Sequence, residues 1–443
     1  MTRPRVLAIA EAANPDWVSV PLVGWSLAHA LRKVADVHLV THTRNRDAIL
    51  AQGYAEDRDV SFIDSDAIAK PLWRLGEKLR MGQGKGWTTV QALNALAYPY
   101  FERLVWRRFS EDLMNGAFDI VHRITPLSPT IASPLARHCA KTGVPFVLGP
   151  LNGGVPWPDG FDSERRRERE FLSYLRTAYK ALPGRRATLR HAAAILAGSR
   201  HTASEIPERF RDKLFYLPEN AVDSLRFTRM APPYAGGSLR GCFIGRLVPY
   251  KGPDMLLSAA APLLSAGRLT LDIIGDGPMM PELRQQAEDE GIDQAVTFHG
   301  WQAHDAVQDI AARSHLLTFP SIREFGGGVV LEAMALGVVP MIVDYAGPGE
   351  LVTPDTGIKI PIGPRAAIIK GLRTALKQVA DNPRMLDPMS IAARDRVHAL
   401  FTWERKAEQV AQVYDWVSGA RAGKPTLLAA PSGSDITPIR SAR

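Results

Sequence analysis

Short apolar segments typical of β-strands alternate with amphipathic segments typical of α-helices along almost the whole chain. Strands are expected at 5–10, 37–41, 119–122, 145–149, 194–198, 213–217, 241–245, 269–275, 296–299, 316–320, 339–343 and 357–360. Helices are expected between them, including 20–33, 129–141, 254–266, 281–290, 329–336 and 366–379. This order is typical of parallel sheets, because a helix must cross over between two parallel strands and the helices then cover both faces. The sequence therefore predicts an α/β chain with doubly wound, Rossmann-like sheets.

A stretch rich in Pro and Gly at 229–238 separates two such strand–helix series and is the best candidate for a linker. We therefore expect a first domain over 1–220 and a second over 235–400. The segment 401–420 contains a further helical pattern. Residues 421–443 are rich in Pro, Ser, Gly and Ala without a period, which indicates a disordered tail.

Composition excludes several classes of protein. With 46% hydrophobic and 23% charged residues, the chain is neither intrinsically disordered nor a coiled coil. Its two cysteines cannot form a disulfide framework, which fits a reducing compartment. No uncharged apolar run approaches the ~20 residues of a membrane span, and the first apolar run is too short for a signal peptide. We therefore expect a cytoplasmic protein.

Positive charge is concentrated in two segments, 70–110 and 164–190, which carry a net +6 each against +8 for the whole chain. Apolar side chains recur on one stripe of a helix expected at 164–182, and tryptophans extend the basic face. These residues are Phe171, Leu175, Ala178 and Leu182, with Trp73, Trp87 and Trp106. Such a face suits an anionic membrane surface, although a helix packed on the first domain explains it equally well. No nucleic-acid-binding module is present in these segments.

Doubly wound sheets bind ligands beyond the carboxyl ends of their strands, so residues just after strands are the first candidates. Arg246 and Lys251 follow Gly245 at the end of one strand and precede a helix. A fork-shaped cation, a point charge and a helix N-terminus together suit a diphosphate, whereas the alternative is a surface loop with solvated cations. Gly275 ends the next strand and permits a close approach of backbone to ligand or neighbouring chain.

The segment 321–337 contains the strongest pattern. Glu324 follows a strand, and Phe325, Gly326, Gly327 and Gly328 lead into an apolar helix that carries Glu332. Free N–H groups at a helix start attract an anion, and Glu324 can then reach hydroxyls attached to that anion. A carboxylate in so apolar a helix needs a partner, and a ribose would supply one. The alternative is that Glu324 is an ordinary acidic residue at a helix N-terminus and Glu332 a surface residue.

Together these motifs resemble those of the retaining glycosyltransferases of family 4, which have the GT-B fold of two Rossmann-like domains facing a central cleft. Gly245-Arg-Leu-x-x-x-Lys251-Gly252 resembles the diphosphate loop of that family, and Glu324 and Glu332, with seven residues between them, resemble its pair of glutamates. The segments 218–227, 296–300, 347–352 and 401–405 also fit, the last as the start of a helix that returns to the first domain.

The resemblance implies a nucleotide diphosphate sugar as donor, with no metal ion and no bound cofactor. Arg246 and Lys251 would neutralise the β-phosphate as it leaves, which lowers the barrier because that charge develops in the transition state. Glu324 would hold sugar hydroxyls, aided by backbone N–H groups at 325–328, and Glu332 would bind the ribose. Retention in this family usually needs no protein nucleophile.

The first domain departs from the family pattern. Its first loop offers only Gly24 where the family often has a glycine pair near the donor phosphates. The family often has His-x-His after the fourth strand, whereas this chain has His122-Arg-Ile124, so the role of the second histidine is open. Asn152, in a glycine-rich turn, is a candidate for the acceptor side.

We expect the acceptor to be a lipid-linked, surface-polysaccharide or glycolipid intermediate, with the protein peripheral on the membrane. Three other interpretations remain open. One is a metal-dependent transferase that uses Asp64-Ser-Asp66. Another is a nucleotide-sugar epimerase of the same fold. The third is a transferase-like binding protein without turnover.

Overall fold

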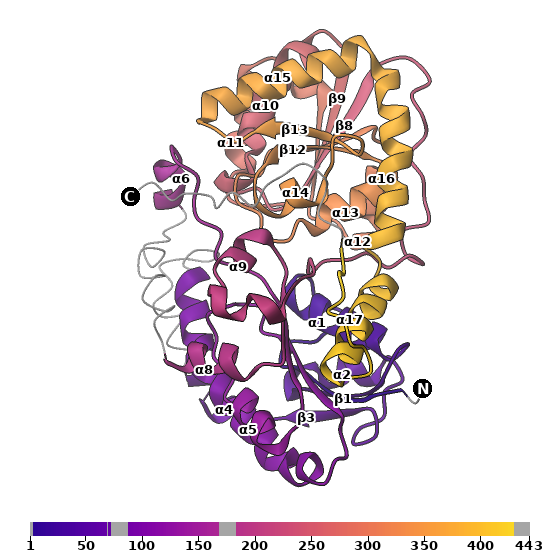
Figure 1. Cartoon of the computed structure of the whole chain (residues 1–443). Helices are drawn as coiled ribbons and strands as arrows, with labels where there is room; N and C mark the ends of the chain where they lie inside the picture. Colours follow the sequence, from indigo (N-terminus) through magenta and orange to yellow (C-terminus); the bar gives the residue numbers. More distant parts are fainter. Residues whose placement is uncertain (1–2, 69, 72–86, 168–182, 429–443) are drawn as a thin grey trace. The chain divides into compact units, whose positions relative to one another are not determined.

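Two parallel sheets organise the chain in the computed structural model, which describes residues 3–68, 70–71, 87–167 and 183–428 (Figure 1). The first sheet has seven strands in the order β3-β2-β1-β4-β5-β6-β7. The second has six in the order β10-β9-β8-β11-β12-β13. All neighbouring strands run parallel. The predicted α/β class with two doubly wound sheets is confirmed.

The strands are short, and most of their residues are buried. Those of the first sheet are β1 (Arg5–Ala10), β2 (Asp36–His42), β3 (Val60–Ile63), β4 (Ile120–Thr125), β5 (Phe146–Leu151), β6 (Ala194–Ala197) and β7 (Leu214–Tyr216). Those of the second are β8 (Leu239–Ile244), β9 (Leu269–Ile274), β10 (Val296–Gly300), β11 (Leu316–Phe319), β12 (Val339–Asp344) and β13 (Ile358–Pro361).

Helices cover the sheets as crossover connections. With the first sheet lie α1 (Val20–Leu31), α2 (Arg46–Leu50), α4 (Trp87–Met114), α5 (Leu135–Thr142), α8 (Pro183–His191), α9 (Arg200–Ser204) and α17 (Trp403–Val417). With the second lie α6 (Asp162–Arg167), α10 (Pro253–Ser265), α11 (Met280–Asp289), α12 (His304–Ala311), α13 (Gly328–Ala335), α14 (Ala346–Leu351), α15 (Arg365–Asp381) and α16 (Leu386–Leu400).

The core of the first sheet is continuous between strands and helices. Leu7, Phe146 and Ile195 from the strands pack in one cluster with Phe101 of α4 and Leu135 of α5. Because helices lie on the sheet in this way, its strands need apolar side chains at successive positions rather than at alternate ones. This explains why the expected strands are continuous apolar runs.

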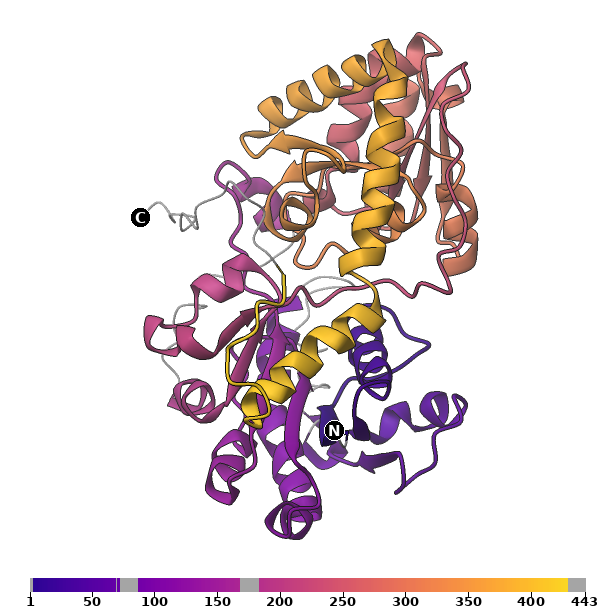
Figure 2. The ribbon, with the colours of Figure 1, turned by 45° about the vertical axis from the view of Figure 1, so that its right-hand side comes forward.

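The chain forms two compact units that do not follow a single division of the sequence. Unit 1 comprises Met1–Gly154, Glu168–Glu219 and Trp403–Arg443. Unit 2 comprises Val155–Arg167 and Asn220–Thr402. Helix α17, in the segment expected to return to the first domain, belongs to unit 1 and packs against α1 (Figure 2).

Residues 155–167, here called the strap, do not lie in the unit that the expected domain division gives them. The division at 220 places them in the first domain, whereas they pack with unit 2. Val155 and Phe161 are each only 1% exposed, and α6 at the end of the strap contacts the short 3₁₀ helix Pro249–Lys251. Apolar burial therefore assigns the strap to unit 2 although its sequence neighbours lie in unit 1.

Several elements lie outside the expected set, among them one strand and two long helices. Strand β3 has only four residues, so its period is too short to detect. Helix α4 continues through Pro99, a residue that normally ends or kinks a helix. Helix α16 buries only a few of its apolar side chains, so its pattern is weak.

Two of the expected membrane features fall outside the described residues: the helix stripe at 168–182 and Trp73. The side chain of Trp87 is likewise not described. Within the described ranges, no helix combines the length and the apolar character that a membrane span requires.

Candidate functional site

The carboxyl ends of β8, β9 and β11 meet at one edge of the second sheet, because β8 pairs with β9 on one side and with β11 on the other. Gly245 and Gly275 lie side by side at this edge, and a Cβ atom on Gly275 would lie 2.0 Å from the Gly245 carbonyl oxygen. Gly275 has a φ of +134°, which L-residues rarely adopt. Both glycines therefore allow two loops to approach closely.

Lys251 and Glu324, from two different loops, form an ion pair at this edge. Lys251 Nζ donates a hydrogen bond of 2.5 Å to Glu324 Oε2, and it lies 4.9 Å from the centre of the Phe319 ring. The two side chains are 14% and 22% exposed. Burial acts to lower the pKa of Lys251, but the Glu324 carboxylate and Tyr250 outweigh it and the pKa lies above its ordinary value. Lys251 is therefore a cation near neutral pH.

Arg246 lies in the loop that connects β8 to Lys251, and it is exposed. The backbone of this loop is held by Leu247, which donates to Asp276 O and accepts from Met279 N. The positive charge of Arg246 acts on Lys251 and opposes the raised pKa of that lysine. The loop thus places two cations near one another at the strand ends.

The glycine segment after Glu324 presents unused backbone donors. Gly327 has a φ of +64° and precedes α13. In the part of the chain that the structure describes, no group accepts a hydrogen bond from the N–H groups of Gly326, Gly327, Gly328 or Val329. Four such donors at the N-terminus of a helix form an electropositive cradle for an anion.

Glu332 lies one helical turn or more beyond this cradle and pairs with a histidine. His304 Nε2 lies 3.4 Å from Glu332 Oε1, and the His304 ring contacts Phe227 edge to face. The hydrogen bond to Glu332 outweighs burial and raises the pKa of His304 above its ordinary value. Glu332 is therefore half-buried with a polar partner, as the apolar helix pattern requires.

The candidates in unit 1 are placed differently. Gly24 lies inside α1 rather than in a loop, and a Cβ atom there would lie 2.1 Å from the Ala12 carbonyl oxygen. Asn152 is buried and donates to Glu219 Oε1 at 2.6 Å. Neither presents a free group to a ligand, so both fit packing and loop-holding roles.

His122 on β4 is fully buried, and both of its ring nitrogens are engaged. Nε2 lies 2.6 Å from Gly149 O, which can only accept, so Nδ1 accepts from Tyr414 Oη at 2.7 Å. Burial lowers the pKa of His122 to about 4. The structure thus places this histidine in the core of unit 1, where it ties β4 to β5 and α17.

Asp64 and Asp66 do meet a third polar side chain. Their carboxylates and the His42 ring have ligand atoms within 4.8 Å of one another. However, His42 Nδ1 accepts from Arg44 N at 3.1 Å, so in the neutral ring the proton occupies Nε2, the atom 3.4 Å from Asp66. A metal needs that nitrogen unprotonated. Asp66 also pairs with Lys70 at 2.6 Å, so the cluster fits hydrogen bonding better than a metal ion.

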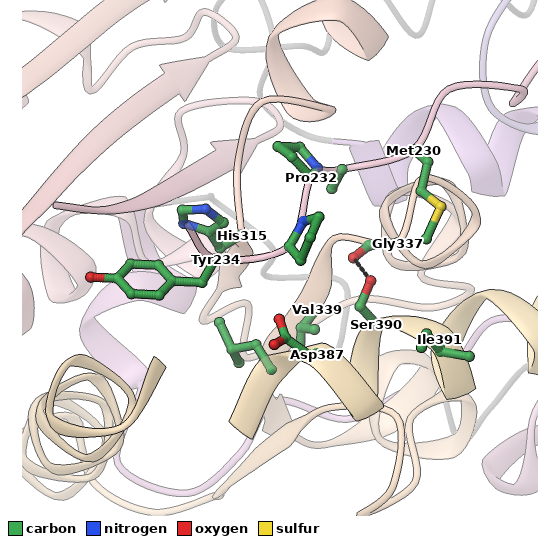
Figure 3. Close-up of a pocket in the computed structure, with 12 residues that line it drawn as sticks. Met230, Pro232, Tyr234, His315, Gly337, Val339, Asp387, Ser390 and Ile391 are labelled. Atoms are coloured by element: carbon green, nitrogen blue, oxygen red, sulfur yellow. Dashed lines mark hydrogen bonds between the residues drawn. The ribbon is translucent and has the colours of Figure 1, made fainter. Parts of the chain in front are cut away.

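A small pocket in unit 2 lies at the opposite edge of the sheet (Figure 3). It is lined by Tyr234, by His315 just before β11 and by Val339 at the start of β12. Ser390 at its wall donates to Gly337 O. Because it lies at the amino ends of the strands, this pocket is separate from the candidate site.

Sequence reasoning missed several residues that shape the site. Trp157 of the strap contacts Tyr250 and Arg323, and His304 contacts Glu332. No sequence motif identifies these residues, because they belong to elements other than the loops that carry the motifs. For Trp157 the only signal is an aromatic residue in a segment rich in Gly and Pro.

Comparison with protein families matches residues 235–395 to the group 1 glycosyl transferases. Among curated proteins, the chain is 29% identical over 231 residues to a glycogen synthase from Mycobacterium tuberculosis, covering 51% of this chain and 55% of that protein. A D-inositol 3-phosphate glycosyltransferase from Rhodococcus opacus is 32% identical over 186 residues, covering 39% and 40%. A GDP-mannose-dependent monoacylated alpha-(1-6)-phosphatidylinositol monomannoside mannosyltransferase from Corynebacterium glutamicum is 30% identical over 230 residues, covering 49% and 57%. The matched segments thus span about half the length of these relatives.

Solved structures match the chain over nearly its full length. HepE from Anabaena, solved with UDP and glucose, has a TM-score of 0.57 at 17% identity and covers 94% of this chain and all of its own. Sucrose-phosphate synthase from Thermosynechococcus elongatus has a TM-score of 0.58 at 16% identity and covers 95% of this chain and all of its own. At such identities the likeness shows the fold, which is GT-B, as predicted.

Proposed function

We propose that this chain transfers a sugar from a nucleoside diphosphate sugar to an acceptor, with retention of the anomeric configuration and without a metal ion. The observation that carries the proposal is the pairing of Lys251 with Glu324 beside four unused N–H groups. These residues come from separate loops, lie at the carboxyl edge of a doubly wound sheet, and fall within the segment 235–395 that matches the group 1 glycosyl transferases.

The charges of the site suit the departure of a nucleoside diphosphate. Lys251 and Arg246 would attract the β-phosphate, and the N–H groups of 326–329 would donate to its oxygens. Because negative charge on that phosphate grows as the bond to the sugar breaks, these donors stabilise the transition state more than the bound donor sugar. Glu324, released from Lys251 by the phosphate, would accept from sugar hydroxyls.

Glu332 and His304 would complete the donor site. Glu332 can accept from ribose hydroxyls, and His304 would hold its carboxylate in place. The carboxylates of Glu324 and Glu332 are both committed to hydroxyl groups in this scheme, so neither is assigned as a nucleophile. We therefore propose same-face attack by the acceptor, with the leaving phosphate as the nearest base.

For the acceptor we propose a lipid-linked or surface-polysaccharide intermediate, or a glycolipid. The basic segments 70–110 and 164–190 support this class, because they attract an anionic membrane surface. The name of the Corynebacterium relative, which acts on a phosphatidylinositol mannoside, is also in keeping with it.

Binding of nucleotides tests the proposal. We expect one of UDP, GDP and ADP to raise the thermal unfolding temperature, since a ligand at 100 times its Kd stabilises a fold by about 2.7 kcal/mol. Lys251→Ala should weaken binding by roughly 10- to 100-fold, the range for a hydrogen bond to a charged group. Lys377→Ala is the matched control, because this exposed lysine of unit 2 pairs with Asp381 on the surface of α15.

Two results would contradict the proposal. One is the absence of binding by all three nucleoside diphosphates, and the other is equal loss of binding in both lysine variants. With the matching sugar nucleotide, the enzyme should slowly hydrolyse the donor, and proton NMR should show that the released sugar first has the anomeric configuration of the donor. The result should be the same with and without EDTA. A first product of inverted configuration would contradict only the retaining mechanism and would leave the proposed sugar transfer in place.

A further inference from the structure

The strap packs with unit 2, where it has buried apolar side chains and a hydrogen bond from Tyr345. Val155 and Phe161 are buried, and Tyr345 Oη donates to Pro156 O at 3.0 Å. Burial raises the pKa of Tyr345 to about 12, so this hydroxyl keeps its proton and its role as a donor across the physiological range. The strap is therefore held in one place on unit 2 rather than lying loosely over it.

Trp157 lies between two loops of the candidate site. Its ring meets the Tyr250 ring edge to face, with centres 6.3 Å apart and planes at 89°. The Arg323 guanidinium lies 5.0 Å from the centre of the Trp157 ring. Arg323 also lies 5.3 Å from the ring of Phe325, so its position is fixed between two aromatic rings.

Tyr250 and Arg323, both in contact with Trp157, are the direct neighbours of the ion pair. Tyr250 precedes Lys251, and Arg323 precedes Glu324. The backbones of the two loops are joined at the same level, since Tyr250 O accepts from Ile322 N at 2.9 Å and from Ser321 Oγ at 3.3 Å. A shift of Trp157 would therefore be passed to both members of the pair through rigid backbone.

We propose that Trp157 is a positioning residue that sets the orientation of Lys251 toward the β-phosphate of the donor. The inference rests on the proposed function, because the diphosphate is its probe. Loss of the ring would free Arg323 to reach the Glu324 carboxylate and would let the loop of Tyr250 move. Lys251 would remain a cation, but its Nζ would no longer be held at the strand edge.

The test compares a nucleoside diphosphate with the monophosphate that lacks the β-phosphate. UDP and UMP are titrated into the full chain, with GDP and GMP as the second pair. The readout is the Kd of the monophosphate divided by the Kd of the diphosphate. We expect Trp157→Leu, which keeps apolar volume but has no ring, to lower this ratio about tenfold, the combined scale of one aromatic pair and one cation–π contact. Trp157→Phe, which keeps a ring face for both neighbours, should stay within about threefold of the wild type.

The ratio separates positioning from simple damage to the fold. A variant that only loses stability weakens both nucleotides alike, and the ratio stays unchanged. Trp106→Ala serves as the control for loss of a large aromatic side chain, since Trp106 stacks on His138 in unit 1.

An unchanged ratio in Trp157→Leu would overturn the inference while leaving the proposed function intact. Equal loss in Trp157→Leu and Trp106→Ala would overturn it as well. Wild-type protein that binds neither diphosphate would overturn the proposed function, and this inference with it.

Discussion

At the scale of single residues, Gly24 shows how the absence of a side chain can serve packing rather than ligand binding. Glycine in the middle of a helix costs about 1 kcal/mol relative to alanine, so its presence in α1 needs a compensating contact. The Ala12 carbonyl supplies it, since it lies where the Cβ atom of any other residue would be. The loop after β1 can therefore lie directly on α1.

We predict that Gly24→Ala lowers the free energy of unfolding by about 1–3 kcal/mol, the usual scale for overpacking, despite the better helix propensity of alanine. Urea unfolding measures this, with Gly423→Ala as the control because nothing lies within 4 Å of its added Cβ atom. Nucleoside diphosphate affinity of the folded variant should stay at the wild-type value. Unchanged stability together with weakened nucleotide binding would instead favour the ligand role that the family resemblance implies.

At the scale of elements, His122 connects two strands and a helix through its neutral form. Its Nε2 donates to Gly149 at β5, while Tyr414 of α17 donates to its Nδ1. The folded pKa of about 4 lies below the ordinary value near 6.5, so between these values the unfolded chain binds more protons than the folded one. Stability from this group is present above pH 6.5 and is lost as the pH falls toward 4.

We predict that the free energy of unfolding of the wild type falls by about 2 kcal/mol more than that of His122→Gln between pH 6.5 and 4.5. Chemical denaturation at several pH values gives the two curves. His315, whose pKa burial also lowers to about 4, contributes to both proteins alike and cancels in the difference. Parallel curves would show that His122 does not titrate in this way.

Most strands and helices could be predicted because their apolar patterns are local. The twelve expected strands all occur, and the missing one, β3, is a strand of only four residues. The loops after β8 and β11 could be predicted as candidate sites for the same reason, since glycines and charged residues follow strands directly in the sequence.

The contacts between these loops could not be predicted in this way. Nothing local to Lys251 indicates a bond to Glu324, 73 residues away, and nothing local to Glu332 indicates His304. The expected boundary at 220 puts the strap in the first domain, because burial of Val155 and Phe161 depends on a surface formed by distant residues. Gly24 likewise depends on Ala12, which reaches it only after β1 and α1 pack.

At the scale of the whole molecule, the uneven charge of the chain leads to a prediction about membranes. Arg103 and Arg107 lie on the exposed side of α4 within the first basic segment. Lys or Arg near an anionic surface contributes about 1 kcal/mol each, so reversal of both charges should weaken membrane binding at least tenfold. We predict this loss for Arg103→Glu with Arg107→Glu in flotation with vesicles of phosphatidylglycerol and phosphatidylcholine at low salt.

Lys370→Glu with Lys377→Glu is the control, because it makes the same change of charge on exposed positions of α15 in unit 2. Binding that falls equally in both double variants would indicate attraction to net charge rather than to a basic face. If the wild-type protein does not float with the vesicles at low salt, the proposed membrane association is wrong.

The strap makes unit 2 discontinuous in the gene, and this limits how the chain can recombine with its relatives. A single crossover within the codons of 229–238 would join one parent's Tyr250 and Arg323 to the other parent's strap. Such a chimera inherits Trp157, or whatever replaces it, from the parent that did not supply its partners. Under the proposed function, donor preference would therefore be inherited unchanged only in exchanges that carry 155–167 together with 220–402.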